Sequence, residues 1–538
     1  MADDDDHSNV SSGSQKKRAR INIVSPGLAS ALDRTKMTSR NATFVLSDVA
    51  ISLGHDVSSL NINRNSIQRE RTRHRATKAS QLLSEFSTSV PLTVHWDGKL
   101  MEDLTFKTHV DRLPVLISGF GVEQLLGVPK LPSGTGEVQA NAVIRCLEEW
   151  GITDQIVALC FDTTAANTGN RVGACSLLEQ KLDRQLLFLA CRHHIMELII
   201  GAAFEKTMGL VSTGPELLLS KRFKEQWQFM DVEKFQPTST DPSVEALVES
   251  SRVNIIEFAE EQLKLKQRRD DYRGFLELSI IFFGGIPARG IHFQAPGAMH
   301  RARWLAKVIY AIKIWLFRGQ FRMTLSEERG IRELAVFAVL IYLKAWISAP
   351  RAVEAPLNDF LLMKQLLQYP QAVVSTATSK KFSLHLWYLS EDLVGLALFD
   401  SRIPPETKKL MLAVMEDDAP EHPPKRPRIA SNAFLGDRGI EQFCTANSKR
   451  LLHIFGLSDE VLSKDPDELR EDMTFQHALA AVTGLAVVKD RAERGVALIQ
   501  DYNGRLTKGE EQLQFLLQVV SDHRKKFPNC VKEAIISK

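Results

Sequence analysis

The chain has 538 residues, of which 25% are charged and 44% are apolar, and its formal net charge is only +3. A net charge this small excludes a surface that is basic throughout, so any basic surface for a polyanion is local. The six cysteines show no zinc-ligand spacing, and their scatter is typical of a reducing, intracellular compartment. No apolar run reaches the ~18 residues that a membrane span needs, so we expect no membrane partner.

The N-terminal residues 1–22 are acidic, then rich in Ser and Gly, then basic, which predicts a disordered tail. Lys16–Arg20 within it is a short basic cluster of the kind that directs nuclear import. A second basic cluster, Pro424–Arg428, lies in the Pro-rich stretch 416–436, which we expect to be a linker. Two such clusters in exposed stretches predict a nuclear protein.

Residues 23–90 predict a small helical domain. Asn41–Gly54 is amphipathic, and its last residue is a suitable stop, while Asn63–Arg75 forms a second helix with many cations. A helix, a glycine-containing turn and a basic helix are the outline of a helix-turn-helix, whose second helix lies in the major groove of DNA. The alternative is a solvated basic helix with no groove to enter. The arginines expected to contact DNA are Arg64, Arg69, Arg71 and Arg73.

From residue 91 the pattern changes to strands alternating with helices. Five apolar runs predict strands, with one helix before the fourth strand and another before the fifth. These strands are expected at 92–97, 113–118, 124–128, 156–161 and 186–190. Three strands, a helix, a strand, a helix and a strand make up the ribonuclease-H-like layout, an open mixed sheet with helices packed on it.

Two carboxylates stand at the ends of strands in this layout. Asp97 ends the first strand and Asp162 ends the fourth, and these two strands are neighbours at the centre of a ribonuclease-H-like sheet. Hard carboxylate oxygens from adjacent strand ends are what a two-metal phosphoryl-transfer site requires. The alternative for either residue alone is a cap at the end of its strand.

The sheet pattern stops after the fifth strand, which runs into Cys191-Arg192-His193-His194. We expect residues 206–415 to be a helical insertion in the sheet domain, 91–205, and residues 437–538 to be C-terminal helices, over 439–455, 475–502 and 508–527, that complete it. Within the insertion, His292–Trp304 gathers cations and a tryptophan around a Pro-Gly turn, an arrangement that stacks on an unpaired base and holds phosphates. The alternative is a helix N-terminus with a buried tryptophan. The predicted fold class is therefore α/β plus all-α.

These landmarks, in their order, resemble the transposases of the hAT superfamily and the host proteins derived from them. The landmarks are Asp97, Asp162 within CFDTTAANTG, Cys191 and His194 as C-x-x-H, Arg303-Trp304 in the insertion, and Ala492-Glu493-Arg494. The resemblance spans about Pro91 to Phe527. It departs from the family in two places: no N-terminal Cys/His zinc finger is visible, and Gly495-Val496 stands where an aromatic residue and a serine are more usual.

The resemblance implies a DNA strand-transfer site in which Asp97, Asp162 and Glu493 hold two Mg²⁺ or Mn²⁺ ions. Glu391 is the rival third carboxylate, and Glu197 is a more distant candidate. The resemblance also implies DNA contacts and a homo-oligomer supported by the C-terminal helices. The implied DNA-binding residues are Cys191 and His194 beside the site, with His194 facing phosphate, and Arg303 and Trp304, with Trp304 stacking on a flipped base or a hairpin end.

Three functions stay open at this point. The first is a metal-dependent DNA transposase or nuclease-like enzyme. The second is a host protein derived from one, which binds DNA or proteins in the nucleus without cleaving DNA. The third is a helical scaffold with an incidental α/β domain. A structure in which Asp97 and Asp162 diverge would exclude the enzyme.

Overall fold

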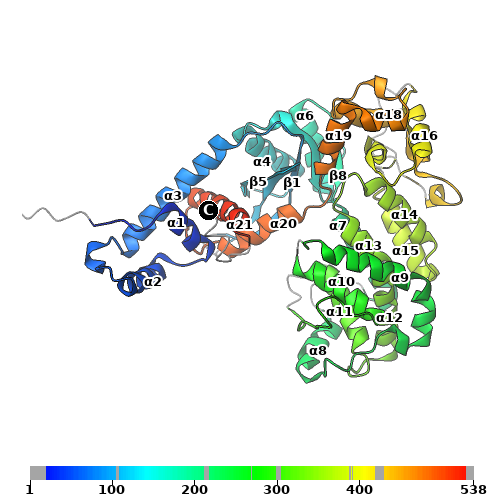
Figure 1. Ribbon diagram of the computed structural model, residues 1–538, viewed down its shortest axis with the longest axis horizontal. Coiled ribbons are helices and arrows are strands. Elements are labelled where there is room, and N and C mark those ends of the chain that lie inside the picture. Colours follow the sequence, from blue (N-terminus) through cyan, green and yellow to red (C-terminus); the bar gives the residue numbers. More distant parts are fainter. Residues whose placement is uncertain are drawn as a thin grey trace, which may run out of the picture. The chain divides into compact units, whose positions relative to one another are not determined.

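The computed structural model describes residues 20–103, 108–210, 217–267, 269–297, 304–386, 389, 392–417, 429 and 431–528. These described residues belong to two compact units, whose elements are labelled in Figure 1. Of the described residues, those within 1–87, 101–109 and 497–538 form the first unit, and those within 88–100 and 110–496 form the second unit.

A five-stranded mixed sheet lies in the second unit. Its strands are β1 (Leu92–Trp96), β4 (Val115–Gly119), β5 (Val122–Gly127), β7 (Ile156–Phe161) and β8 (Leu187–Ala190). Their order across the sheet is β5-β4-β1-β7-β8. Strand β1 is antiparallel to β4 and parallel to β7, which is parallel to β8. The five predicted strands are therefore present, and the first and fourth of them are neighbours as expected.

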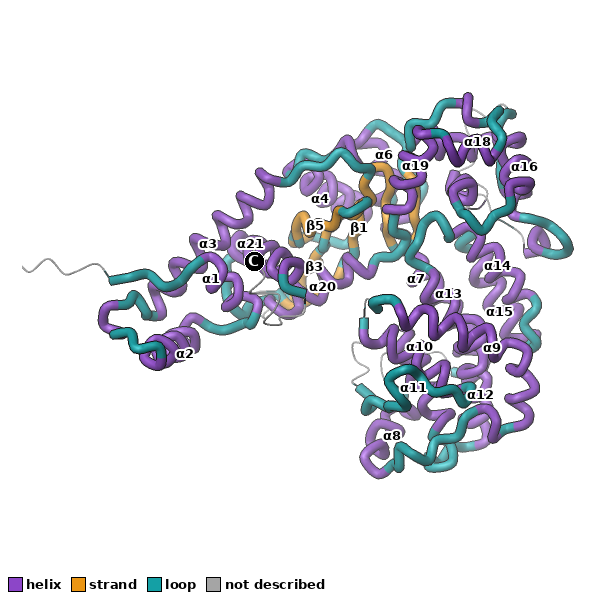
Figure 2. Tube along the Cα trace, in the orientation of Figure 1, coloured by secondary structure: helices purple, strands orange, loops and turns teal. Residues whose placement is uncertain are grey.

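The sheet is buried on both faces, which explains why its strands read as continuous apolar runs. Every residue of β1, β4 and β8 is buried. Helices α4 (Gly136–Glu149) and α6 (Ala174–Leu182) pack against each other, and α4 also contacts β5 (Figure 2). The remaining elements of this region are β2 (Lys99–Glu102), β3 (His109–Arg112), β6 (Lys130–Leu131) and the short helix α5 (Ala165–Thr168).

The rest of the second unit is helical. A π-helical turn, Ala338–Tyr342, joins two of its helices into one longer element. The helices are α7 (Arg192–Met208), α8 (Leu218–Gln226), α9 (Pro242–Lys264), α10 (Asp270–Phe282), α11 (Trp304–Leu316), α12 (Leu325–Phe337), α13 (Leu343–Ser348), α14 (Ala355–Leu367), α15 (Ala372–Ser383), α16 (Pro405–Met415), α17 (Lys449–Ile454), α18 (Pro466–Glu471) and α19 (Met473–Gly484).

The prediction of one helix over residues 475–502 is wrong, because an extended segment, 485–489, interrupts it. Helix α19 ends at Gly484, and α20 (Asp490–Tyr502) begins after the interruption. Gly484 approaches the turn of the sheet so closely that an added Cβ would lie 2.5 Å from the backbone nitrogen of Phe120. The extended segment also contains two adjacent valines, whose branched side chains disfavour a helix.

Helices from both ends of the chain form the first unit. The N-terminal helices are α1 (Pro26–Arg34), α2 (Ser39–Ser52) and α3 (Arg64–Glu85), and α21 (Glu510–Lys526) packs against α1 and α3. The two helices predicted at 41–54 and 63–75 are present, and Gly54 after the first has a φ of +80°. The predicted C-terminal segment 437–538 is divided, because its residues from Ala497 onwards belong to this unit.

A buried carboxylate binds two of these helices together. Asp33 of α1 accepts hydrogen bonds of 2.6–2.9 Å from Arg71 and Arg75 of α3, and all three side chains are at most 1% exposed. The two arginines are one helical turn apart, so their guanidinium groups meet at one carboxylate. Arg71 Nη1 also donates to Met37 O and Ser39 Oγ. Arg71, predicted to contact DNA, therefore lies in the interior of the unit.

We expect Arg71→Ala to destabilise the first unit by about 3 kcal/mol, because removing one partner leaves a buried ion pair incomplete. Hydrogen exchange of the α1 and α3 amides should then become roughly 100-fold faster. The matched control is Arg73→Ala on the same helix, whose side chain is 67% exposed and pairs with Glu70. Equal exchange rates in the two variants would contradict a structural role for Arg71.

Candidate functional site

The ends of β1 and β7 bring the two predicted carboxylates together. Asp97 follows β1 and Asp162 follows β7, and the two strands are parallel with His95 paired to Cys160. One ammonium group contacts both carboxylates: Lys489 Nζ lies 2.9 Å from Asp97 Oδ1 and 3.7 Å from Asp162 Oδ2. Asp97 and Asp162 thus converge on a single cation and do not diverge.

The polar turn after β7 fixes the orientation of Asp162. Its Oδ1 accepts hydrogen bonds from Thr164 Oγ1 at 2.6 Å and from Asn167 Nδ2 at 2.7 Å. Asn167 Oδ1 in turn accepts a hydrogen bond from Trp96 Nε1 at 2.9 Å, which links the turn to the end of β1. With Oδ1 held in this way, Oδ2 is the oxygen that faces Lys489.

Asp97, Lys489 and Asp162 form an ion triad, in which the opposite charges stabilise the ionised forms of Lys489 and Asp162. Burial acts to lower the pKa of Lys489, but the carboxylates of Asp97 and Asp162, together with the nearby sulfur of Cys191, outweigh it and raise that pKa above its ordinary value. Burial likewise acts to raise the pKa of Asp162, but Lys489 and the hydrogen bonds from Thr164 lower it overall. The lysine side chain is 12% exposed, so the charge pairing takes place largely out of water.

The extended segment that carries Lys489 is attached to the residues after β8. Arg192 N donates a hydrogen bond to Val487 O at 2.9 Å, and Lys489 N donates one to Cys191 Sγ at 3.3 Å. Cys191, implied by the resemblance to contact DNA, is fully buried. Its thiol therefore faces the backbone of Lys489 and positions the lysine.

His193 fixes the first residue of α20 through a buried network. Its Nδ1 lies 2.7 Å from Asp490 Oδ1, and its Nε2 lies 3.0 Å from Trp346 O. The imidazole stacks on the Trp346 ring with centroids 3.8 Å apart, and Tyr272 donates a 2.9 Å hydrogen bond to Asp490 Oδ2. Because Asp490 directly follows Lys489, this network determines where the ammonium group lies.

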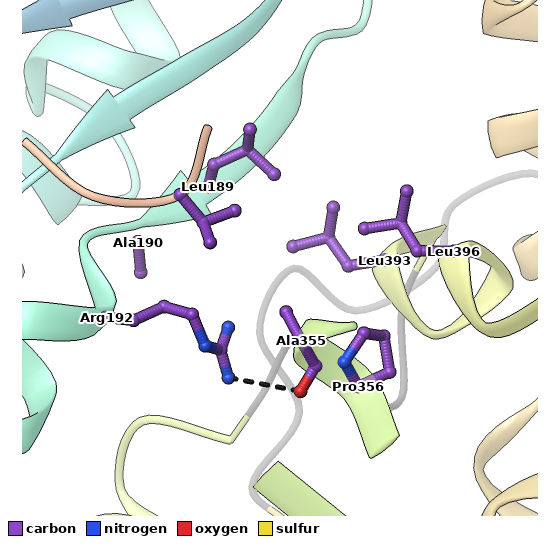
Figure 3. A pocket seen from close by; sticks show the side chains of 8 residues that line it. Leu189, Ala190, Arg192, Ala355, Pro356, Leu393 and Leu396 are labelled. Atoms are coloured by element: carbon purple, nitrogen blue, oxygen red, sulfur yellow. Dashed lines mark hydrogen bonds between the residues drawn. The ribbon is translucent and has the colours of Figure 1, made fainter. Parts of the chain in front are cut away.

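Arg192 connects the same region to the helical insertion. Figure 3 shows its guanidinium directed at Ala355, whose carbonyl oxygen accepts a hydrogen bond from Nη2 at 3.3 Å. The same side chain forms an ion pair with Asp359 of α14, and both partners are buried. Arg192 and Ala355 line a small cavity. The side chains of Leu393 and Leu396 line it from the other side (Figure 3).

Glu493, the implied third carboxylate, lies one turn after Lys489 on α20, and its backbone N–H donates to Lys489 O at 3.0 Å. Across the described part of the chain, no three or more His, Cys, Asp or Glu side chains are grouped closely enough to hold a metal ion. Glu197 lies in α7 and is partly buried. The rival Glu391 and Arg303 lie outside the described residues, as does the side chain of Trp304, the first residue of α11.

His194 is electrostatically coupled to the ion triad. Burial and the charge of Lys489 lower the pKa of His194, while Asp162 and Asp97 act in the opposite direction. Burial, together with His194 and Lys381, lowers the pKa of His385 to about 4. Both imidazoles are therefore neutral at neutral pH. The sequence identified His194, whereas His385 stands in no motif.

The remaining predicted DNA contacts lie on the surface of α3. Arg64, Arg69 and Arg73 are exposed, in contrast to the buried Arg71. The basic cluster Lys16–Arg20 lies outside the described residues except for its last member, and Pro424–Arg428 lies wholly outside them.

No protein-family model matches the chain, and no curated protein matches it either. Of the helices that the structure describes, none is long and apolar enough to cross a membrane.

Replacing Lys489 with glutamine should raise the affinity of the site for divalent cations above that of the unaltered chain. Without the ammonium, two adjacent carboxylates repel each other, and a hard cation relieves that repulsion. We expect Mn²⁺ or Mg²⁺ to raise the melting temperature of the Lys489→Gln protein by several degrees, as roughly 1–2 kcal/mol of binding would. The control is Lys234→Gln, which removes an exposed pair with Asp231. An equal metal response in all three proteins would contradict the expectation.

The lowered pKa of His385 makes the second unit less stable in acid. The folded chain keeps this imidazole neutral down to about pH 4, whereas the unfolded chain protonates it near pH 6.5. The free energy of unfolding should therefore fall as the pH drops from about 6.5 to about 4, by roughly 3 kcal/mol in total.

His385→Gln should flatten this pH dependence, and His477→Gln, which alters an exposed imidazole in α19, should not. Urea titrations followed by tryptophan fluorescence measure the effect, since every tryptophan whose position the structure describes belongs to the second unit. An unchanged slope in the His385 variant would refute the assignment.

Proposed function

We propose that this chain is a nuclear DNA-binding protein derived from a transposase, in which Lys489 closes the former strand-transfer site. The observation that carries the proposal is the contact of one ammonium group with both Asp97 and Asp162. Two ionised carboxylates that lie side by side repel each other, and a cation between them offsets that repulsion. In this chain the cation is the ammonium group of Lys489.

The strand order supports a ribonuclease-H-like identity for the sheet. Strands β1 and β7 are parallel neighbours, and β4 and β5 continue the sheet from β1 in antiparallel steps. The acidic residues follow the two strands that a nucleotidyl-transfer site of this layout uses. The segment with Lys489 and Glu493 also returns to the sheet after the helical insertion, as the resemblance to hAT transposases implies.

A metal ion does not fit the arrangement that the structure describes. The oxygens it would need, Asp97 Oδ1 and Asp162 Oδ2, are the atoms that face Lys489. No third ligand from the described residues joins them to form a metal-binding group. The ammonium also cannot accept a proton from water or supply the open coordination positions on which two-metal catalysis depends. Strand cleavage therefore has no place in the proposed activity.

The proposed DNA contact is the exposed side of α3. Arg64, Arg69 and Arg73 are solvent-accessible and lie on a helix held rigid by the buried pairs with Asp33. Arginine side chains at such positions pair with phosphates or with guanine edges. Neutralised phosphates release counterions, so binding through these residues is expected to weaken steeply with salt.

A second candidate function, a metal-dependent transposase, is favoured by the convergence of Asp97 and Asp162 on one cation position. In such an enzyme Mg²⁺ or Mn²⁺ would stabilise the charge on the attacking and leaving oxygens. Lys489 would have to leave the carboxylates before either ion could bind.

The test combines DNA binding with DNA cleavage. The unaltered chain should bind duplex DNA with a salt-dependent affinity, and the triple variant Arg64→Ala, Arg69→Ala, Arg73→Ala should reduce the salt slope by about 3. In Mg²⁺ or Mn²⁺ the unaltered chain should leave supercoiled DNA intact. Cleavage by the unaltered chain that is lost in Asp162→Asn would establish the transposase instead. An unchanged salt slope in the triple variant would exclude α3 as the DNA contact.

A further inference from the structure

Several large apolar side chains are exposed on α2, within the first unit. The helix packs inward through small side chains, Ala42 and Ala50, which leaves its larger side chains outside. The side chains of Phe44, Val45, Val49 and Ile51 are 46–64% exposed. Leu53, just after the helix, is 69% exposed. Large apolar side chains exposed together on one element, with polar residues beside them, mark an interaction surface.

Opposite charges stand on either side of Phe44 in this surface. Arg40, Phe44 and Asp48 follow one another at intervals of four residues, so they form one row along the helix. The two charged residues are separated by about 12 Å along the helix axis, since the rise is 1.5 Å per residue. That distance is too great for them to pair with each other. Both side chains are exposed, and the described residues provide neither of them with an ion-pair partner.

We propose that this surface, the α2 face, binds the α2 face of a second copy of the chain, with the two helices antiparallel about a twofold axis at Phe44. From N- to C-terminus the row reads cation, aromatic ring, anion, and in an antiparallel partner the order is reversed. Each Arg40 then faces Asp48 of the partner subunit, and the two Phe44 rings meet at the axis. A parallel pair would bring like charges together.

A second row of exposed residues completes the α2 face. Val45, Val49 and Leu53 are also four residues apart and lie beside the first row. Rows of this spacing are the ridges that interlock when two helices pack. In the antiparallel pair they cover the Phe44 rings on one side and keep water from the two ion pairs. A partner of different sequence would have to carry the same reversed charges, whereas a second copy carries them by symmetry.

Sedimentation velocity of the full chain tests this arrangement. The unaltered chain should show a monomer–dimer equilibrium, and Arg40→Asp or Asp48→Arg alone should each weaken the dimer about tenfold or more, because two pairs become repulsive. The double variant Arg40→Asp, Asp48→Arg should restore the dimer to within about threefold of the unaltered affinity. An equimolar mixture of the two single variants should form a heterodimer, since each then presents the charges that the other lacks.

Phe44→Ser should also weaken the dimer, whereas Phe229→Ser, at an 81% exposed phenyl ring elsewhere in the chain, should not. All of these side chains are exposed, so circular dichroism should stay unchanged in every variant, as should the melting temperature at concentrations where the unaltered chain is monomeric. A chain that is monomeric at all concentrations would overturn the proposal. A dimer that survives Phe44→Ser and both charge reversals would also overturn it, as would a double variant that fails to recover.

Discussion

Two carboxylates at the ends of neighbouring parallel strands repel each other, and partial burial strengthens the repulsion because little water screens it. The second unit relieves this repulsion with the ammonium of Lys489, which approaches Asp97 and Asp162 from a segment far along the chain. Several features of the unit serve to hold that ammonium in place. The interruption after Gly484 provides the extended backbone that carries Lys489. The Cys191 sulfur accepts a hydrogen bond from the Lys489 N–H. The His193 network fixes the position of the next residue, Asp490.

The strands and both acidic positions could be predicted because they depend on local pattern. A strand buried on both faces must be apolar along its length, and a residue such as Asp162 stands out where that run stops. Lys489 could not be found in the same way. Residues 475–502 contain the apolar spacing of a helix, and the interruption arises from the close approach of Gly484 to the Phe120 backbone. A contact between residues so distant in sequence has no local signature, although the lysine just before an acidic helix start was a usable hint.

The first unit shows why a count of charges does not reveal their role. Helix α3 carries exposed arginines such as Arg69 beside Arg71 and Arg75, which are buried against Asp33. The sequence predicts a basic helix in either case, since a guanidinium group has the same formal charge in water and in the interior. The buried arginines differ from the exposed ones in their contact with the Asp33 carboxylate of α1. The apolar residues of α2 pose the converse problem, because the amphipathic pattern predicts a helix without stating what its apolar face, Phe44 included, will contact.

The tether between Lys489 and the backbone sets this site apart from one filled by a free ion. A metal ion leaves when a chelator lowers its concentration, and its occupancy follows the supply in the surrounding compartment. An ammonium joined by its own side chain to a fixed backbone stays at a high effective concentration that neither dilution nor chelation changes. The carboxylate pair is therefore neutralised to the same extent in metal-poor and metal-rich surroundings, so the integrity of this sheet edge does not depend on the supply of metal.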